Sequence, residues 1–226
     1  MKLQSTGSSS AGLVQNGQNW SLSLPMEPSF VLFETAIGTC AIAWGSRGIV
    51  GLSLPAGNSD TPRAGIAKRF PDVAERQPEP EIETVILDIQ ALLAGEARDL
   101  LGATLDFDGI PDFHRRVYEV TRAIPPGQTL TYGQVSDRLK APGTSRAVGQ
   151  ALGANPFPII VPCHRILAAS GKAGGFSAPG GLDTKLKMLN IERVHAEGEQ
   201  GLFGSLPLAI PPGRWRTIPN SRRRQS

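Results

Sequence analysis

A cysteine and a histidine stand side by side at positions 163 and 164, directly after the apolar run 159–161 and a proline. A thiolate is a strong nucleophile, but a free thiol with a pKa of about 8.5 is mostly protonated at neutral pH. His164 is the nearest base that could take the proton from Cys163. The apolar run is typical of a buried strand, so the sequence predicts a reactive thiol where a strand ends.

Two short helices separated by a tight turn are predicted upstream of this pair. The first spans 132–139, with Thr131 as its N-cap. The second begins after Thr144 or Ser145 and runs to Leu152. This arrangement is typical of helix-turn-helix DNA-binding proteins, although an ordinary helical hairpin has the same pattern.

The second predicted helix is rich in Ala and Gly and has a single arginine, Arg146. Side chains that read base edges in the major groove are usually Arg, Lys, Asn or Gln, so this helix is poorly suited to that task. Its small residues would instead let the backbone approach a narrow surface such as a minor groove. Ala147 and Ala151 could equally pack against a neighbouring helix, and we expect this for one of the two.

The first half of the chain has a different pattern. Three apolar runs, 30–37, 40–44 and 49–54, are separated by turns that contain glycine, which predicts an antiparallel meander. Apolar residues at helical spacing predict a core-packed helix over 81–93, and a short strand over 105–107 would close this part. The fold class is therefore α+β, with a small antiparallel sheet and a helix, then a mostly helical half. In that second half, Asp112 is a candidate N-cap.

Charge divides the chain at about the same point. Residues 29–105 carry six Lys or Arg against ten Asp or Glu, and residues 110–195 carry eleven against five. A basic half beside an acidic half indicates contact with a polyanion, although a solvated surface of mixed charge would give the same counts. The predicted division is a polar tail over 1–28, domains over 29–107 and 108–195, and a flexible basic tail over 196–226.

Composition narrows the setting. No apolar run approaches the ~20 residues of a membrane span, and no secretory signal is recognisable. The two cysteines, Cys40 and Cys163, do not suit a disulfide scaffold, so a reducing, cytoplasmic compartment is expected. Cysteine and histidine are also too few for a structural zinc site, and no metal or cofactor is predicted.

Five motifs follow one another along the chain: Tyr132-Gly133-Gln134, Ser145-Arg146-Ala147-Val148-Gly149, Asn155-Pro156, Pro162-Cys163-His164-Arg165 and a closing helix over 180–192. Their order resembles that of the O6-alkylguanine-DNA alkyltransferases, also called methylated-DNA–protein-cysteine methyltransferases. The resemblance is close over 108–195, whereas 29–107 resembles the family's ribonuclease-H-like N-terminal domain in outline. It implies direct, stoichiometric transfer of an alkyl group from O6 of guanine in DNA to Cys163, after the base is flipped out from the minor-groove side. The protein would be consumed by the reaction.

The resemblance implies roles for five residues in the chemistry. Glu192 would fix the tautomer of His164, which would activate Cys163 through a bridging water. Tyr132 would rotate the nucleotide out of the duplex and donate a proton to the departing base. Asn155 would brace the motifs against each other.

The resemblance also implies a DNA face and a base pocket. Arg146 would fill the gap that the flipped base leaves in the stack. The other predicted DNA-binding residues are Thr131, Tyr132, Ser145, Ala147, Gly149 and Ala151. In the pocket, the backbone carbonyls of Cys163 and Ile166 would accept from the guanine amino group, the Ser177 N–H would face the guanine oxygen, and Phe176 would lie at the rim.

The expected partner is double-stranded DNA carrying O6-alkylguanine, bound by a monomer in the cytoplasm, at the nucleoid if the source is bacterial, with no membrane partner. Two alternatives stay open. A non-catalytic lesion-binding relative would lack the acceptor cysteine, and a helix-turn-helix transcription regulator is not favoured by the Ala/Gly helix. A thiol protease is disfavoured because adjacent Cys and His are not how such pairs are arranged.

Overall fold

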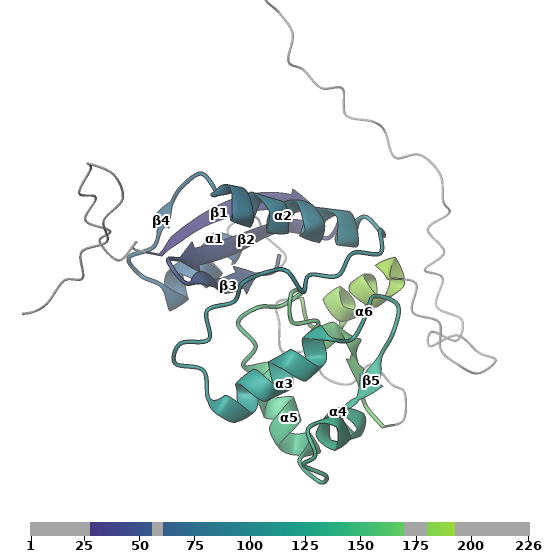
Figure 1. Ribbon diagram of the computed structural model, residues 1–226. Coiled ribbons are helices and arrows are strands. Elements are labelled where there is room, and N and C mark those ends of the chain that lie inside the picture. Colours follow the sequence, from purple (N-terminus) through teal and green to yellow (C-terminus); the bar gives the residue numbers. More distant parts are fainter. Residues whose placement is uncertain (1–27, 56–60, 170–179, 193–226) are drawn as a thin grey trace, which may run out of the picture. The chain divides into compact units, whose positions relative to one another are not determined.

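The three apolar runs of the first half pair into an antiparallel sheet (Figure 1). Strands β1 (Ser29–Thr35), β2 (Gly38–Gly45) and β3 (Gly48–Ser53) follow one another through tight turns. A fourth strand, β4 (Ala74–Glu75), joins β1 in parallel and gives the order β3-β2-β1-β4. The predicted meander is confirmed. The computed structural model describes residues 28–55, 61–169 and 180–192.

Gly48 makes the turn between β2 and β3 possible. Its φ is 121°, and a Cβ there would lie 2.6 Å from the carbonyl oxygen of Thr104, so the position requires glycine. This close approach lets the Ile49 N–H donate to Thr104 at 2.9 Å. The strand predicted over 105–107 is wrong, because Leu105 makes only an isolated bridge with Ile49 before the chain turns away from the sheet.

Helices cover both faces of the sheet. Side chains alternate along a strand, so Ile42 packs with α2 (Pro80–Leu93) on one face, while Ala43 packs with Ile66 of α1 (Thr61–Arg69) on the other. The helix predicted over 81–93 is confirmed as α2. Helix α1 was not predicted, because only two of its nine residues are buried and they leave no clear periodicity.

Three helices of the second half, α3 (Asp112–Arg122), α4 (Tyr132–Arg138) and α5 (Ser145–Gly153), pack on one another. In their shared core the hydroxyl of Tyr118 donates to the carbonyl of Ala151 at 2.9 Å. The mixed α+β architecture is confirmed. No helix in the described ranges is long and apolar enough to cross a membrane.

The helix starts differ in detail from the predictions. Thr131 caps α4 as predicted: its hydroxyl accepts from the Gln134 N–H at 3.2 Å, and the Gln134 side chain accepts from the Thr131 N–H at 2.7 Å. Thr144 takes the N-cap position of α5 without a side-chain capping bond. Pro111 takes the N-cap position of α3, so the prediction for Asp112 is wrong; its carboxylate lies in the first turn, where the helix dipole favours negative charge.

Two short strands join distant parts of the helical half. Strand β5 (Leu130–Thr131) pairs in parallel with β6 (Ile166–Leu167). Because β5 leads into α4 and β6 follows the Cys-His pair, this pairing brings the start of α4 beside residues 163–165. The last helix, α6 (Gly181–Ile191), packs on the same segment.

Candidate active site

Cys163 opens one turn of 3-10 helix, η1 (Cys163–Arg165), and does not end a strand. The apolar residues before it form a tight loop, in which Ile159 has a φ of 73° and the Val161 N–H donates to the Phe157 carbonyl at 2.8 Å. The strand predicted here is therefore wrong. Apolar, β-branched residues suit a buried loop as well as a strand when the backbone polar groups of the loop find partners.

Asn155 supplies two of those partners. Its side-chain oxygen accepts from the Phe157 N–H at 2.9 Å, and its side-chain amide donates to the Val161 carbonyl at 2.9 Å. The Cys163 N–H donates to the same Val161 carbonyl at 2.7 Å. Asn155 thus closes the loop that leads to the thiol.

The sheet holds this loop at the buried carbonyl of Pro156. That oxygen accepts from the Leu52 N–H of β3 at 2.9 Å and from the Arg69 guanidinium, at the end of α1, at 3.3 Å. Both donors belong to the first half of the chain. The first half therefore helps to position the loop that carries Asn155.

Glu192, just after α6, binds the two residues that follow the cysteine. Its carboxylate accepts from His164 Nε2 at 3.0 Å, and from Arg165 at 2.9 and 2.7 Å in a bidentate pair. The third donor of Arg165 reaches the carbonyl of Ile124 at 2.5 Å. The side chains of His164 and Glu192 are 1% and 2% exposed, so the whole group is out of water.

The charges in this group define the tautomer of His164. Burial alone would raise the pKa of Glu192, but the hydrogen bonds from His164 and Arg165 outweigh it and lower the pKa to about 2. Burial lowers the pKa of His164 against the opposing effect of Glu192, so the imidazole is neutral at pH 7. An ionised carboxylate only accepts, so His164 carries its proton on Nε2. Its Nδ1 is buried, has no hydrogen-bond partner among the described residues and is left as the basic atom.

Cys163 is a buried residue, 9% exposed. Burial raises its pKa above the ordinary value, while a hydrogen bond from the Asn155 side chain and the positive charge of Lys185 act in the opposite direction. No hydrogen bond joins the thiol to the His164 ring. Ionisation of Cys163 therefore depends on a base reached through a bridging group.

Lys185, which has no exposed surface, was not among the residues predicted from the sequence. Its Nζ donates to the carbonyl of Ile166 at 2.5 Å, and burial lowers its pKa to about 8. A signal was present, because a lysine at position 185 recurs at helical spacing with the buried residues Met188 and Leu189 and with Glu192. A lysine on an apolar face either extends to solvent or donates to a buried acceptor, and Lys185 donates to the carbonyl of Ile166.

Tyr132, at the start of α4, lies beside α5. A Cβ on Gly149 would lie 3.8 Å from the Tyr132 ring, so the absence of a side chain at this position lets the helix pass close to the phenol. Burial, and then the negative charge that Cys163 can carry, raise the pKa of Tyr132. The phenol is therefore protonated at neutral pH and can donate a proton near the thiol.

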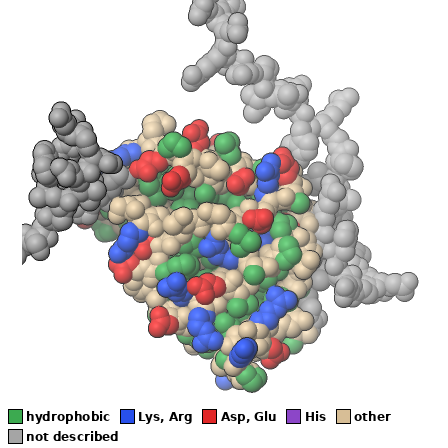
Figure 2. Space-filling model, viewed as in Figure 1, with side chains coloured by type: hydrophobic (Ala, Val, Ile, Leu, Met, Phe, Trp, Pro, Cys, Tyr) green, Lys and Arg blue, Asp and Glu red, His purple; other side chains and the backbone are tan. Residues whose placement is uncertain are grey.

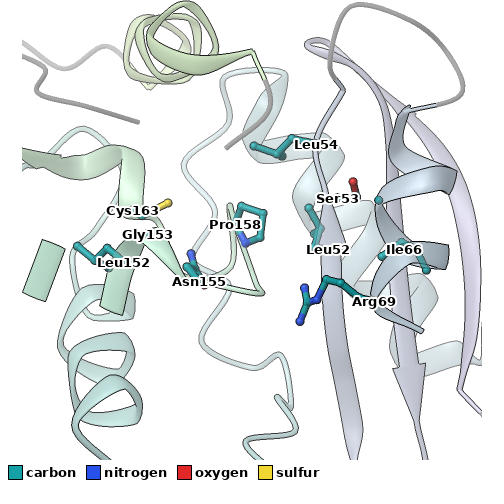
Figure 3. A pocket seen from close by; sticks show the side chains of 11 residues that line it. Leu52, Ser53, Leu54, Ile66, Arg69, Leu152, Gly153, Asn155, Pro158 and Cys163 are labelled. Carbon is teal, nitrogen blue, oxygen red and sulfur yellow. The ribbon is translucent and has the colours of Figure 1, made fainter. Parts of the chain in front are cut away.

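A cavity of about 230 Å³ lies beside Cys163 (Figure 3). Leu52 of β3 and Ile66 of α1 line one wall, and Leu152 and Pro158 line the opposite wall, next to the cysteine. The cavity is large enough for more than a methyl group and is mostly apolar around the thiol.

The residues predicted to face DNA do not all reach the surface. Arg146 is exposed on the first turn of α5, with Ser145 and Ala147 half-buried beside it. Thr131 is half-buried, and its hydroxyl is used in the helix cap. The prediction for Ala151 is wrong, because this residue has no exposed surface and packs against α3.

Two further predictions fall where no comparison with the structure is possible. Phe176 and Ser177, expected at the base pocket, lie outside the described residues.

Across 28–55, 61–169 and 180–192, no group of three or more His, Cys, Asp or Glu could hold a metal ion.

Comparisons with known proteins match the chain around this site. Residues 112–194 match the model of the 6-O-methylguanine DNA methyltransferase, DNA binding domain. The chain is 44% identical over 113 residues to the methylated-DNA–protein-cysteine methyltransferase of Mycolicibacterium paratuberculosis, a match that covers 50% of this chain and 66% of that relative. It is 34% identical over 158 residues to the protein of the same name from Methanothermobacter thermautotrophicus, covering 70% of this chain and 81% of that relative. The chain belongs to the methylated-DNA–protein-cysteine methyltransferase family.

A solved methylated-DNA–protein-cysteine methyltransferase relative shares the fold. The OGT of Mycobacterium tuberculosis, whose structure was determined in complex with DNA, is 32% identical, with a TM-score of 0.59. The match covers 73% of this chain and 92% of that chain, which is more than the family model's 112–194. The likeness to this methyltransferase therefore includes the first half of the chain.

Proposed function

We propose that Cys163 accepts the alkyl group when this chain repairs O6-alkylguanine in double-stranded DNA by direct transfer. The observation that carries the proposal is the neutral His164, one residue from a thiol that lines a cavity. Glu192 binds its Nε2, and no described residue binds its basic Nδ1. A base, a nucleophile and space for a substrate are the three parts that such a transfer needs.

The side chains of the site account for every proton and electron pair that moves in the transfer. The proton of Cys163 passes through a bridging water to Nδ1 of His164, and the thiolate attacks the methyl carbon. The S–C bond forms as the C–O6 bond breaks, and the electron pair of the C–O6 bond stays on the guanine oxygen. Tyr132 donates a proton to the departing base, which leaves more easily as a neutral purine, and the proton held by His164 restores the phenol through solvent.

The product explains why the protein acts once. A thioether is a poor leaving group at neutral pH, so Cys163 stays methylated. Cys40 cannot accept the methyl group, because it is buried in β2, where burial raises its pKa to about 12. The chain is therefore consumed stoichiometrically.

Helices α4 and α5 form the DNA-binding unit of this proposal, as a helix-turn-helix that approaches the minor groove. Exposed arginines and lysines of the helical half provide attraction to phosphate, whereas Asp and Glu gather along α2 (Figure 2). The target base must leave the duplex before a buried thiol can reach it. Arg146 is exposed at the start of α5 and fills the gap left in the stack.

Three finer features belong to the same proposal. The first half is a ribonuclease-H-like domain over 29–107, followed by the alkyltransferase domain over 108–195. The repair unit is a monomer. The compartment, cytoplasmic with access to the nucleoid in a bacterium, stays a prediction from the sequence.

The site of methylation tests the proposed function. After incubation with a duplex that contains one O6-methylguanine, intact-mass analysis should show one added methyl group per chain. Peptide mapping should place it on Cys163. Tight binding without a change of mass would instead indicate a non-catalytic lesion-binding protein, and a methyl group on another residue would refute the assignment of Cys163.

Replacement of Arg146 by alanine tests the flipping step. The variant no longer fills the gap in the stack, and since extrusion of a base costs a few kcal/mol, transfer from duplex DNA should fall roughly 10- to 100-fold. Transfer from a free O6-alkylated guanine base should be unchanged, because no base has to leave a duplex. Arg138→Ala, which removes an exposed arginine at the end of α4, is the matched control for charge. Equal losses on both substrates would contradict the role.

A further inference from the structure

Lys185 is the buried cation that the proposed mechanism does not use. Lysine is almost never fully buried without a partner, because moving an ammonium out of water is costly. Here the side chain has no exposed surface, although it lies on a helix whose neighbouring residue Lys187 is exposed. Burial of Lys185 therefore calls for a specific interaction that outweighs its cost.

That interaction is with a backbone carbonyl. No carboxylate among the described residues lies within ion-pair distance of Lys185, and the nearby carboxylate of Glu192 is taken by His164 and Arg165. The Nζ of Lys185 donates to the carbonyl of Ile166 at 2.5 Å. A charge-assisted hydrogen bond of this kind is about twice as strong as a neutral one.

The carbonyl of Ile166 belongs to β6, the short strand that follows the nucleophile. Ile166 is fully buried and pairs with Leu130 across the two-stranded sheet, three residues after the nucleophile. The carbonyl of Cys163, which the family resemblance also implies as an acceptor for the base, accepts from the Ile166 N–H. A carbonyl oxygen has two lone pairs, so each of these oxygens can accept one hydrogen bond more.

The remaining lone pair gives the contact its selectivity. When Lys185 occupies one lone pair of the Ile166 oxygen, the other points in one direction only. A guanine bears an exocyclic amino group that can donate along that direction, whereas a purine without this group cannot. Removal of the lysine would take away the charged donor that fills one lone pair, so that this oxygen could accept from another donor.

We propose that Lys185 is a positioning residue for base specificity: by binding the Ile166 carbonyl, it holds that oxygen where it accepts from the amino group of an alkylated guanine. This inference rests on the proposed function and adds to it the element that selects the base. Lys185 does not touch the reacting atoms and acts through Ile166.

The test compares two duplexes that differ only in the amino group. One contains O6-methylguanine and the other O6-methylhypoxanthine, which lacks the amino group, and the rate of methyl transfer to Cys163 is measured for both. The native chain should prefer methylguanine by roughly tenfold, the effect of one hydrogen bond. Lys185→Met should bring this ratio close to one, whereas Lys187→Met, on the exposed side of α6, should leave it unchanged.

The ratio separates specificity from other effects of the lysine. Loss of the positive charge near Cys163, or a looser fold, slows both substrates equally and cancels in the ratio. Lys185→Gln keeps an N–H donor without the charge and should retain most of the preference. If the methionine variant does not fold, Lys185→Ala is the second variant without a donor.

Two outcomes overturn the inference. One is an unchanged ratio in the variants without a donor, which would leave Lys185 acting on the thiol or on the fold alone. The other is an equal loss of preference in the Gln variant and in the variant without a donor. Absence of transfer from either substrate in the native chain would instead refute the proposed function, so the two failures are distinguishable.

Discussion

Replacement of Cys163 by serine should abolish methyl transfer while leaving the affinity for DNA within about threefold of the native value. A hydroxyl is almost fully protonated at neutral pH, and neutral His164 is too weak a base to ionise it for attack on an sp³ carbon. The side chain stays small and buried, so packing around η1 changes little. Affinity for DNA generally depends mainly on contacts with phosphate, and the substitution changes no exposed basic residue.

Intact mass and a DNA-binding isotherm on the same preparation measure the two effects. Cys40→Ala is the control, because this second cysteine lies in the sheet and should keep full transfer. Residual stoichiometric methylation in the Cys163→Ser variant would mean that another residue is the acceptor.

The second large effect is expected for Glu192→Gln. An amide can donate to His164 Nε2, which would move the imidazole proton to Nδ1 and remove the base that the thiol needs. By analogy with hydrolase triads, where the wrong tautomer costs about 10⁴-fold, transfer should fall by at least about 100-fold. The variant also leaves Arg165, 5% exposed, without its carboxylate, which for a buried pair costs about 3–5 kcal/mol of folding stability.

The stability effect has a defined dependence on pH. The pKa of Glu192 is lowered in the folded chain from 4.5 to about 2, so its contribution to folding is complete above pH 4.5. It is lost as the pH falls from 4.5 toward 2, because protons then bind the unfolded chain more readily than the folded one. Urea unfolding of native chain and variant at pH 7 and pH 3 should show a smaller difference at the lower pH.

An exposed ion pair provides the control for Glu192. Glu119 binds Arg115 one turn away on α3, with both side chains about half exposed. Such pairs contribute about 0–1 kcal/mol, so Glu119→Gln should change neither stability nor transfer appreciably. If Glu192→Gln behaves like this control, Glu192 is not the group that holds His164.

Local signals made part of this fold predictable from the sequence. The meander followed from alternating apolar runs broken by glycine, and the start of α4 followed from Thr131 and Gln134, whose mutual hydrogen bonds need no tertiary context. Cys163, His164 and Glu192 were named from chemistry and motif order. In the structure His164 Nε2 lies 3.0 Å from the Glu192 carboxylate, and Cys163 is the first residue of η1, the turn that also contains His164.

Other features depend on contacts that a sequence pattern does not carry. The run 159–161 looks like a strand, but Asn155 satisfies the polar groups of a loop instead. Ala151 lies on the same helix as Arg146, and only packing on α3 decides that it faces inward. Lys185 looks like a solvated lysine until the carbonyl of Ile166 is placed beside it.

The bond between Leu52 and the Pro156 carbonyl has a consequence for how this chain can evolve. The donor is a backbone N–H, so its strength does not depend on which side chain occupies position 52, with proline as the one exclusion. Substitutions at position 52 therefore leave this bond in place, whereas the second donor to the same oxygen, the Arg69 guanidinium, depends on its side chain. A chain cut near residue 108 would lose both donors to a buried oxygen, at a cost of about 1–3 kcal/mol. The helical half therefore depends on the first half of the chain for the position of the loop that leads to the nucleophile.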